Sequence, residues 1–522
     1  MPKWISPCRL SPIASRAGRI NVPLSVVWFK RDLRTTDHAP LMNAITQCVQ
    51  NGDELLLVYL FEPEMLAHPT TSSRHLCFQW QAIQGLNQRL VSQGLSLKIH
   101  PLQASAADVF KWLHSQHQLQ FLFSHEETGL RYTYERDLNV KNWCARNDVV
   151  WNETPQLGVI RGLQNRKRWS YRWHANMRKP PIKVDFNPWL KAGLLPCIPE
   201  WPSPWKMTAP PKPTHEHDVL GKGPFQMGGE EQAQQLLTSF IKDGRIENYQ
   251  KHISKPEESR QSCSRLSPYL AWGQLSMRQV FQALEACESK TMAHRAFGSR
   301  LRWHCHFIQK FESEHRIETE NMNRGFDDMT VVTNGDNLLR WMNGDTGIPF
   351  IDACMRCVRE TGYLNFRMRA MLVSFLTHHM GHSWKDGVNH LARCFLDFEP
   401  GIHFCQFQMQ AGVTGINTLR IYNPVKQGLD HDPDGLFIRK WVPSLQEVPL
   451  AFVHEPWRMP PLELAMQGGD TRSVAPMIDI KATARQARSR LWTFKNHPAV
   501  RAEAQRILNV HVDTRYQRRR RP

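Results

Sequence analysis

The 522-residue sequence has no apolar run long enough to cross a membrane. Its longest apolar runs, such as Leu55 to Phe61, fall far short of the ~20 residues that a spanning helix needs. Residues 1–22 lack the continuous apolar stretch of a secretory signal, and they also lack acidic residues. We therefore expect no membrane association. A transit peptide also begins without acids, but a mis-assigned start codon or an unstructured basic extension explains residues 1–22 better.

Common enzyme signatures are missing as well. The sequence contains no P-loop, no GxGxxG, no GxSxG and no HExxH. Among its 12 cysteines, Cys354 and Cys357 have metal-like spacing, but they fall in a helical-looking stretch and no second pair with zinc spacing exists. We predict reduced cysteines, no metal centre and a cytoplasmic location.

The composition is that of a folded protein with an excess of positive charge. Hydrophobic residues make up 41% and charged residues 22%, which excludes a disordered or collagen-like chain, and the net charge is +18. Residues 23–155 carry 11 basic and 13 acidic residues, whereas residues 156–235 carry 12 basic and 6 acidic residues. Positive charge attracts polyanions, so nucleic acid is a candidate partner, and simple solubility is an equally good explanation.

Strand-like and helix-like patterns alternate over residues 23–155. The β-rich runs are Leu24–Phe29, Glu54–Phe61, Leu95–His100 and Leu119–Ser124, and helical patterns cover Ala39–Val49 and Arg74–Gln93. Such alternation predicts an α/β domain with a doubly wound parallel sheet.

The rest of the chain reads differently. Residues 156–235 are rich in proline and predict a long irregular linker. Residues 236–508 show helical patterns without strand-like alternation, so we predict an all-α domain there. The basic residues 509–522 are predicted to form a disordered tail.

Two polar segments in helical context are candidates for chemistry. Ser264–Gly273 places hydroxyls and an arginine before a helix that starts near Pro268, which suits a phosphate group, although a plain serine cap has the same pattern. Asp397–His403 reads as an acidic loop after the helix that includes Trp384. Arg367 and Arg369, on an earlier helix, could pair with it, in a functional or a purely structural ion pair.

Ordered motifs across the chain resemble the photolyase/cryptochrome flavoproteins. Val26–Arg34 (VVWFKRDLR) resembles the opening strand of that family, and Ser264–Gly273 resembles its flavin-phosphate loop. Further matching runs follow in the family's order: Trp341–Met355, Tyr363–Arg369, Asp397–Thr414, Arg420–Gly428, Phe437–Pro443 and His454–Trp457. Many ordered motifs are far more specific than a single short pattern.

The resemblance implies an N-terminal α/β domain, a linker and a helical domain that binds FAD beside a cavity for a flipped-out pyrimidine dimer. It implies that Arg369 and Asp397 form an ion pair against the flavin, that Glu399 reaches the flavin edge or ribose, and that Trp303 stacks on the lesion. The residues implied to bind FAD are Tyr249, Ser264, Arg265, Leu266, Ser267, Arg369, Asp397, Glu399 and His403. Trp384 matches the middle tryptophan of the family's photoreduction chain.

Several positions depart from the family pattern. Arg300 stands where many members that repair cyclobutane dimers have a carboxylate, and a cation cannot accept hydrogen bonds from a thymine. His403 falls at the polar position facing the flavin, where it could donate a proton or simply form a hydrogen bond. Phe407 and Phe326 replace the outer tryptophans, which cuts the usual electron route and leaves a route through other Trp or Tyr residues as the alternative.

The resemblance also implies an antenna chromophore of the pterin or deazaflavin type in the α/β domain. Ser124–Gly129 follows a strand and could border such a site, or it could be a loop with capping carboxylates.

We expect a monomeric, light-driven photolyase that acts on UV-damaged DNA. The alternatives are a cryptochrome-like photoreceptor without repair activity and a nucleic-acid binder that keeps FAD as a structural element.

Overall fold

The computed structural model describes residues 22–156, 158–218, 221, 223–288, 290–466 and 475–513. The predicted N-terminal extension lies outside the described residues, apart from Val22. The predicted tail lies outside them from residue 514 onward, and its first residues belong to the last helix, which ends at His511.

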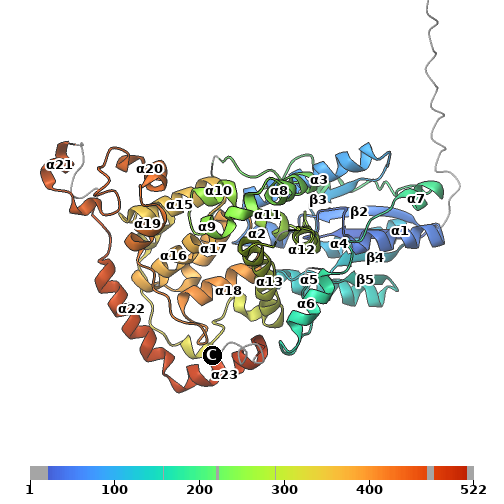
Figure 1. Cartoon of the computed structure of the whole chain (residues 1–522). Coiled ribbons are helices and arrows are strands. Elements are labelled where there is room, and N and C mark those ends of the chain that lie inside the picture. The colour runs from blue at the N-terminus through green and yellow to red at the C-terminus, as the bar shows by residue number, and fades with distance from the viewer. Residues whose placement is uncertain are drawn as a thin grey trace, which may run out of the picture.

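A five-stranded parallel sheet forms the N-terminal domain, as predicted (Figure 1). Its strands are β1 (Leu24–Phe29), β2 (Glu54–Leu60), β3 (Ile99–Leu102), β4 (Leu119–His125) and β5 (Val150–Thr154), in the spatial order β3-β2-β1-β4-β5. The helices between them are α1 (Ala39–Asn51), α2 (Pro63–Ala67), α3 (Ser73–Ser92), α4 (Ala106–His117) and α5 (Arg131–Arg146).

The central strands are buried on both faces, which explains their continuous apolar runs. Successive side chains of a strand point to opposite faces, so Val27 and Phe29 pack with α1 and α3, whereas Val26 and Trp28 pack with α4 and α5. β3 begins four residues later than predicted and contains Pro101, which an edge strand tolerates.

The proline-rich stretch is more ordered than predicted. It contains α6 (Trp169–Met177), α7 (Asn187–Lys191) and a single turn at Ser203–Trp205, and α8 (Glu230–Lys242) begins before its end. Trp169, Trp173 and Met177 recur every four residues and bury one face of α6 in the helical domain. Trp189 and Trp201 instead pack into the α/β domain, so this segment is fastened to both domains.

The helical domain builds its core from many short helices, and none of its described residues forms a strand. The helices before residue 330 are η2 (Arg245–Asn248), α9 (Tyr249–His252), α10 (Glu258–Ser262), α11 (Ser267–Ala271), α12 (Met277–Glu285), α13 (Met292–Ser313), η3 (His315–Glu318) and η4 (Arg324–Phe326). Then come α14 (Gly335–Asn343), α15 (Pro349–Thr361), α16 (Phe366–Ser374), η5 (Phe375–His379), α17 (Trp384–Cys394), α18 (Pro400–Ala411), α19 (Pro424–His431), α20 (Leu436–Trp441), η6 (Pro443–Leu445), η7 (Pro456–Arg458), α21 (Pro461–Met466), α22 (Ile480–Lys495) and α23 (Pro498–His511).

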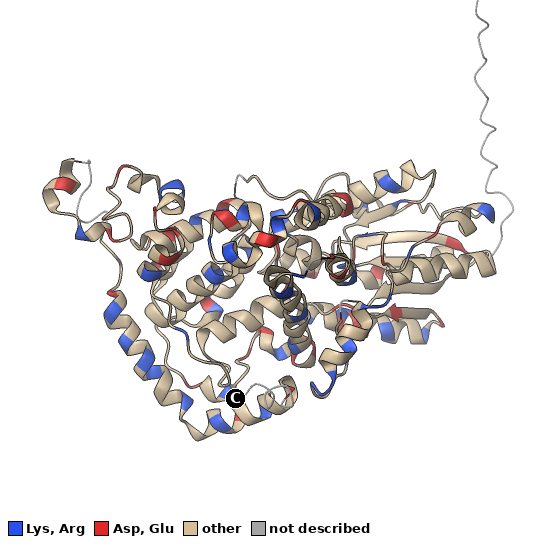
Figure 2. Cartoon of the chain, in the orientation of Figure 1, with Lys and Arg blue, Asp and Glu red and all other residues tan. Residues whose placement is uncertain are grey.

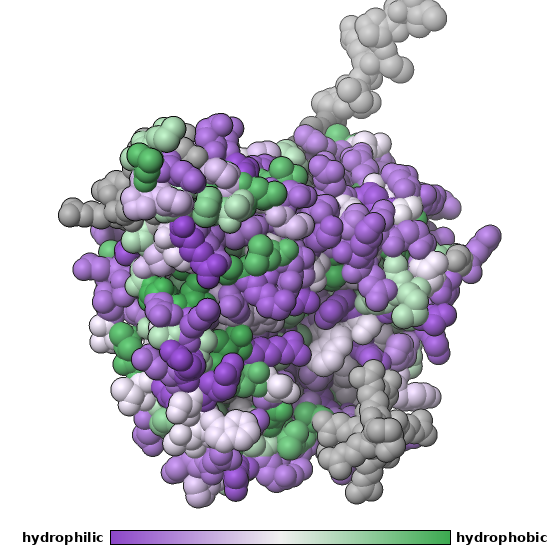
Figure 3. All heavy atoms as spheres, turned by 60° about the vertical axis from the view of Figure 1, so that its left-hand side comes forward, coloured by the Kyte–Doolittle hydropathy of each residue, from purple (hydrophilic) through white to green (hydrophobic). Residues whose placement is uncertain are grey.

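The surface is mostly hydrophilic on the face shown in Figure 3, where hydrophobic side chains gather only in small separate groups. None of the described helices is both long and apolar enough to cross a bilayer. The eleven cysteines among the described residues are all free.

Candidate functional site

A cavity of about 270 Å³ lies inside the helical domain, and we call it the central cavity. It is lined from α9, the segment before α11, α16, the loop after α17, and α18. The residues that line it are Tyr249, Ile253, Cys263, Ser264, Arg265, Ser267, Tyr363, Leu364, Asn365, Phe366, Arg369, Ala370, Val373, Phe395, Asp397, Phe398, Glu399, Ile402, His403, Gln406, Phe407 and Gln410.

All the predicted FAD residues except Leu266 line this cavity. The side chain of Leu266 is 1% exposed and packs in the apolar core instead. Arg265, its neighbour, adopts a left-handed φ of 55°, which is costly for a residue with a side chain. Gln226 holds this conformation, because its amide donates to the Arg265 carbonyl (2.9 Å) and accepts from the Arg265 guanidinium (2.8 Å). The turn therefore leaves Ser264, Arg265 and Ser267 at the cavity and directs only Leu266 into the core.

Helix α11 begins at Ser267, close to the predicted start, but it is only five residues long. A helix this short has little dipole to offer an anion. The polar character of this wall therefore comes from the hydroxyls of Ser264 and Ser267 and from the Arg265 guanidinium, which lies 3.7 Å from the centre of the Tyr363 ring.

Arg369 and Asp397 form an ion pair at the cavity wall. The Arg369 Nη2 donates to Asp397 Oδ2 at 2.9 Å, and its Nε donates to the carbonyl of Leu364 at 2.6 Å. Burial opposes the ionisation of Asp397, but the Arg369 charge and hydrogen bond outweigh it and hold the pKa of this carboxyl below its usual value. The pair thus places a fixed carboxylate and a fixed guanidinium beside the cavity.

Glu399 connects the cavity to the α/β domain. It caps α18 by accepting from the Gly401 N–H (3.4 Å), and its Oε2 lies 3.4 Å from Arg31 in the loop after β1. Arg31 also donates to the carbonyls of Ala271 (2.9 Å) and Phe398 (2.8 Å). Burial raises the pKa of Glu399, and the Arg31 charge opposes this rise.

The predicted acidic loop ends at Glu399, because Pro400 starts α18 and places His403 within that helix. The His403 Nε2 lies 2.8 Å from the Val388 carbonyl, which can only accept, so Nε2 carries the proton. Burial lowers the pKa of His403 to about 4, so the ring is neutral at pH 7. Its Nδ1 is consequently an acceptor, which favours a hydrogen-bonding role over proton donation.

The aromatic residues of the predicted electron route lie apart from one another. Trp384 is buried and donates to Asn321 at 2.7 Å, and its ring centre lies 6.5 Å from that of Phe404. Phe407 lines the cavity, 4.8 Å from the His403 ring, whereas Phe326 stacks on Phe494.

Helix α13 carries Arg300 and Trp303, which with His403 and Trp384 are the residues that the resemblance assigns to the reaction. Burial raises the pKa of the Tyr249 hydroxyl, and the nearby positive charge of Arg300 partly offsets this rise. Trp303 is 44% exposed and lines a different cavity, with Phe307 and His306. Its predicted role in stacking on a lesion stays a prediction.

Sequence reasoning missed part of the cavity wall. Gln406 and Gln410 join His403 and Phe407 on one face of α18, at the i, i+3, i+4, i+7 spacing of a helix. A polar stripe of this kind on an otherwise apolar helix would have indicated in the sequence that this face lines a polar site. Ile253 and Arg31 carried no such signal, because only the fold brings them to the site.

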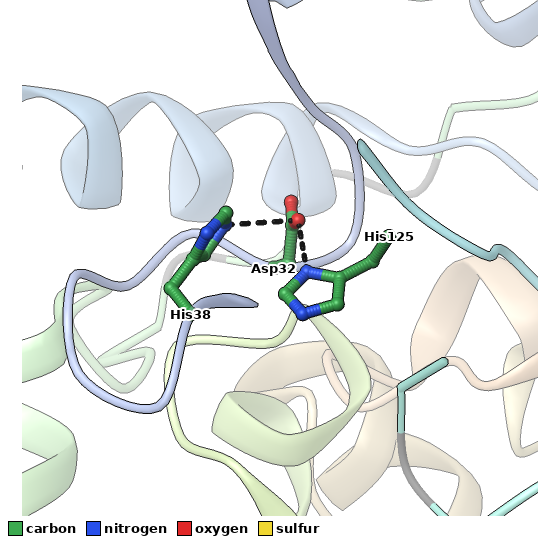
Figure 4. A group of neighbouring side chains, drawn as sticks. All are labelled: Asp32, His38 and His125. Carbon is green, nitrogen blue, oxygen red and sulfur yellow. Dashed lines mark hydrogen bonds and ion pairs between the residues drawn. The ribbon is translucent and has the colours of Figure 1, made fainter. Parts of the chain in front are cut away.

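Asp32, His38 and His125 form a buried group at the carboxyl ends of β1 and β4, with the aspartate between the two rings (Figure 4). The Asp32 Oδ2 lies 2.7 Å from His125 Nδ1 and 3.0 Å from His38 Nε2. These are residue types that bind metal ions. However, the His38 Nδ1 accepts from the Leu41 N–H (3.1 Å), so its proton is on Nε2, which then has no lone pair for a metal. We interpret the group as a hydrogen-bonded network that ties the loop after β1 to α1 and β4.

The loop predicted to border an antenna has little free space around it. The two cavities that it helps to line, through Glu126, Glu127 and Thr128, measure about 50 and 20 Å³. Arg136 lines the larger of the two and pairs with Glu62 and Glu127, each at 2.7 Å. A pterin or deazaflavin ring could enter only if these side chains moved.

Family models match both domains. The DNA photolyase model matches residues 25–160, and the model of the FAD binding domain of DNA photolyase matches residues 297–493. The chain belongs to the photolyase/cryptochrome family. The predicted family and fold class are confirmed.

Relatives in this family carry two kinds of name. The chain is 26% identical over 451 residues to the deoxyribodipyrimidine photo-lyase of Alkalihalophilus pseudofirmus, which covers 84% of this chain and 90% of the relative. It is 26% identical over 495 residues to cryptochrome DASH of Natronomonas pharaonis, covering 88% and 98% of the two chains. The solved Synechocystis sp. PCC6803 cryptochrome has the same fold, with a TM-score of 0.76 at 22% identity over 90% of this chain and 100% of that chain.

The residues of the central cavity fit the FAD that this domain of the family binds. Asp397 Oδ1, Asn365 Oδ1 and Arg265 Nε are buried, belong to the cavity wall and have no hydrogen-bond partner among the described residues. Buried polar atoms are almost always paired, so these two acceptors and one donor call for a polar group in the cavity. A flavin nucleotide supplies both kinds of partner.

Proposed function

We propose that this family member is a light-dependent DNA photolyase that splits UV-induced pyrimidine dimers, with FAD as its cofactor. The observation that carries the proposal is the position of α13. The same helix presents the half-exposed Trp303 at the mouth of a cavity lined by the cations Arg166, Arg302 and Lys310, and places Arg300 beside Tyr249 at the central cavity. It thus joins a surface suited to DNA with the cofactor site.

When bound, reduced FAD would supply the light-driven electron-transfer chemistry that splits a dimer, and Arg369, Asp397 and His403 line the cavity that would hold it. The chain's own residues control the surroundings of this transfer. Arg369 holds a positive charge and Asp397 a negative charge at the wall, while neutral His403 offers an acceptor. Phe395, Phe398, Phe404 and Phe407 surround the His403 ring at 4.8–6.0 Å and keep this side apolar.

A blue-light receptor without repair activity is the second candidate. The observation that favours it is the isolation of Trp384, whose neighbours on the predicted electron route are Phe407 and Phe326. Phenylalanine is not readily oxidised, so photoreduction by that route is expected to be slow. A receptor would then need another route, whereas a photolyase that receives its flavin reduced would not.

The test is a repair assay on defined cyclobutane and (6-4) dimers in single- and double-stranded oligonucleotides. The protein is chemically reduced and illuminated at 450 nm, with a dark sample as the control. We expect light-dependent loss of one dimer type. Light-dependent change in mass or partner binding without any loss of dimer would identify a receptor, and tight binding to DNA without either effect would identify a structural flavoprotein. The absorption spectrum of the same sample tests for an antenna, and light scattering tests the predicted monomer.

A further inference from the structure

Helix α22 runs along the outer edge of the helical domain, on the side away from the parallel sheet (Figure 1). A cavity of about 240 Å³ lies between this helix and residues 412–419, which follow α18, and we call it the α22 groove. None of its lining residues lines the central cavity, and only Asn417 also lines the cavity beside Trp303. The α22 groove is therefore a separate site.

The floor of the α22 groove is apolar. Phe326 and Leu491 line it and are 2% and 3% exposed. Gly412, the C-cap of α18, has a left-handed φ of 79°, and a Cβ there would lie 3.2 Å from Leu419 and 3.6 Å from Leu491. A side chain at this position would therefore occupy part of the groove. The glycine keeps the floor open, which suits a flat ring.

The rim of the groove is aromatic and positively charged. Arg488 and Lys495 line it from α22, together with Trp492, and all three side chains are exposed. The Trp492 side chain is 63% exposed, although tryptophan is on average a highly buried residue. Among the described residues that line the groove, none is acidic. The groove thus offers an exposed aromatic ring and two cations to a ligand that arrives from solvent.

The same face of α22 carries positive charge beyond the groove. Residues 480–495 include five basic residues and no acidic one. At about 100° per residue, the exposed Lys481 and Arg485 lie on the same face as the three residues of the rim, within an arc of about 80°. From Lys481 to Lys495 this face extends for about 21 Å along the helix axis. The positive surface is therefore longer than the groove.

Contacts on the inner face of α22 fix the direction of this surface. Thr483 Oγ1 lies 2.9 Å from His379 Nδ1, and the Arg490 Nη2 donates to the Thr377 carbonyl at 3.0 Å. Both partners belong to η5, which follows directly on α16. The helix is thus held in place before any ligand binds, and a ligand does not have to order it.

The chemistry of this surface fits a nucleotide better than a membrane. Proteins bind nucleotides without reading their sequence by stacking the base on an exposed aromatic ring and placing cations near the phosphate. A helix that binds a membrane must instead turn its apolar residues to the lipid. In α22, Ala487 and Leu491 are buried against the protein, so they are not free to enter a bilayer.

We propose that the α22 groove binds a nucleotide, with its base against Trp492 and its phosphate between Arg488 and Lys495. A free nucleotide and a nucleotide within a strand share this chemistry. Lys481 and Arg485 favour the strand, because they continue the positive surface past the groove. The inference rests on the proposed function only in taking DNA as the source of that strand.

The test measures binding in the dark, so that repair plays no part. It uses FAD-loaded protein that carries Trp303→Ala, so that no base stacks on that tryptophan. Fluorescein-labelled oligothymidylate is titrated at several salt concentrations, and thymidine 5′-monophosphate is used as a competitor. We expect Trp492→Ala to weaken binding of the strand about 5- to 150-fold, the loss of one stacked base. Arg488→Gln should reduce the slope of log K against log salt by about 0.7, the loss of one phosphate contact on a single strand.

Tyr134→Ala and Lys141→Gln on α5 are the matched controls. They remove an exposed aromatic ring and an exposed cation from the α/β domain, and neither should change the affinity or the salt slope. Unchanged binding in both α22 variants would overturn the proposal, once flavin content and thermal unfolding show that they are folded.

The remaining outcomes separate the possible ligands. Equal affinity for the monophosphate and the strand would support the nucleotide site and reject the strand as its source. Sedimentation with phosphatidylserine vesicles that Arg488→Gln abolishes, with strand binding unchanged, would assign the surface to membranes and overturn the proposal. Absence of repair by the wild-type protein, with the expected dark binding, would refute the photolyase function and leave this inference standing.

Discussion

At the scale of single residues, the Arg369–Asp397 pair makes the clearest prediction. Replacing Arg369 with Met leaves the Asp397 carboxylate buried without its cation. We expect a loss of about 3–5 kcal/mol in the free energy of unfolding at pH 7 and a lower ratio of bound FAD to protein. Because the pKa of Asp397 is lowered in the folded state, the stabilisation is present above its ordinary value near ~3.9 and is lost as the pH falls through the lowered pKa. Urea unfolding of the two proteins at pH 7, well above that window, therefore measures the full loss.

Arg367→Met is the matched control on the same helix. The Arg367 Nε donates to Ser254 at 3.0 Å, and the residue does not line the central cavity. This variant should keep its FAD. If both variants retained FAD and stability alike, the pair would not belong to the cofactor site.

Residues of the site were predictable where a local motif fixes the direction of the side chain. Ser264 and Ser267 reach the cavity as expected, but Leu266 between them turns into the core, because the left-handed Arg265 reverses the chain there. Trp303 shows the same limit. Its position on α13 follows from the sequence, but which cavity its ring enters depends on how α13 packs against α6 and α18.

At the scale of elements, the loop after β1 stabilises the start of α18. Arg31→Met removes two hydrogen bonds to carbonyls and the cation next to buried Glu399. We expect a loss of about 2–3 kcal/mol in the free energy of unfolding and weaker retention of FAD, although Arg31 itself lies in the other domain. Chemical unfolding and the absorbance of bound flavin measure the two effects.

Arg131→Met provides the comparison for a surface pair. Arg131 bonds Glu135 at 2.7 Å, but both side chains are more than half exposed. Exposed pairs of this kind contribute little to stability because solvent screens them, so we expect this variant to unfold almost as the wild-type protein does. Equal losses in the two variants would mean that Arg31 acts as an ordinary surface charge.

Figure 2 shows a row of basic residues on helix α22. Lys481, Arg485, Arg488 and Lys495 are exposed and recur on one face of this helix, and we call these four cations the α22 stripe. We expect Arg485→Gln combined with Arg488→Gln to weaken binding to duplex DNA and to lower its salt slope by up to about 0.9 for each lost phosphate contact. Lys141→Gln with Arg146→Gln on α5 removes the same charge from the acidic domain and should change neither quantity. Fluorescence anisotropy at several salt concentrations decides between them, and identical slopes for the two double variants would exclude α22 from the DNA surface.

Elements with a strong pattern were predictable, and weakly patterned ones were not. The buried strands β1, β2 and β4 are predictable because each contains a run of apolar residues. β5 lies at the sheet edge, is half exposed and reads VWNET, so its polar sequence gave no strand signal. Helix α6 was not predicted because prolines lie on both sides of it, although its two tryptophans have the spacing of a helix.

At the scale of the whole molecule, buried histidines link stability to pH. Burial lowers the pKa of His75, His378 and His390 to about 3 and that of His304 and His403 to about 4. An unfolded chain binds protons on these rings near pH ~6.5. Between the two values the unfolded state therefore holds more protons than the folded state, and stability falls as the pH falls.

This linkage predicts a steep loss of stability on mild acidification. Each such histidine costs about 1 kcal/mol at one pH unit below 6.5, so the urea midpoint should fall clearly between pH 7.5 and pH 5.5. His378→Gln removes one titrating ring, and its amide can still donate to the Gln410 carbonyl that the His378 Nε2 contacts at 2.8 Å. The stability that this variant loses between pH 7.5 and pH 5.5 should be smaller by about 1 kcal/mol. His217→Gln replaces an exposed ring, and this variant should lose as much stability between pH 7.5 and pH 5.5 as the wild-type protein. If the two variants lost stability equally, His378 would take up its proton in the folded state, and burial would not be setting its pKa.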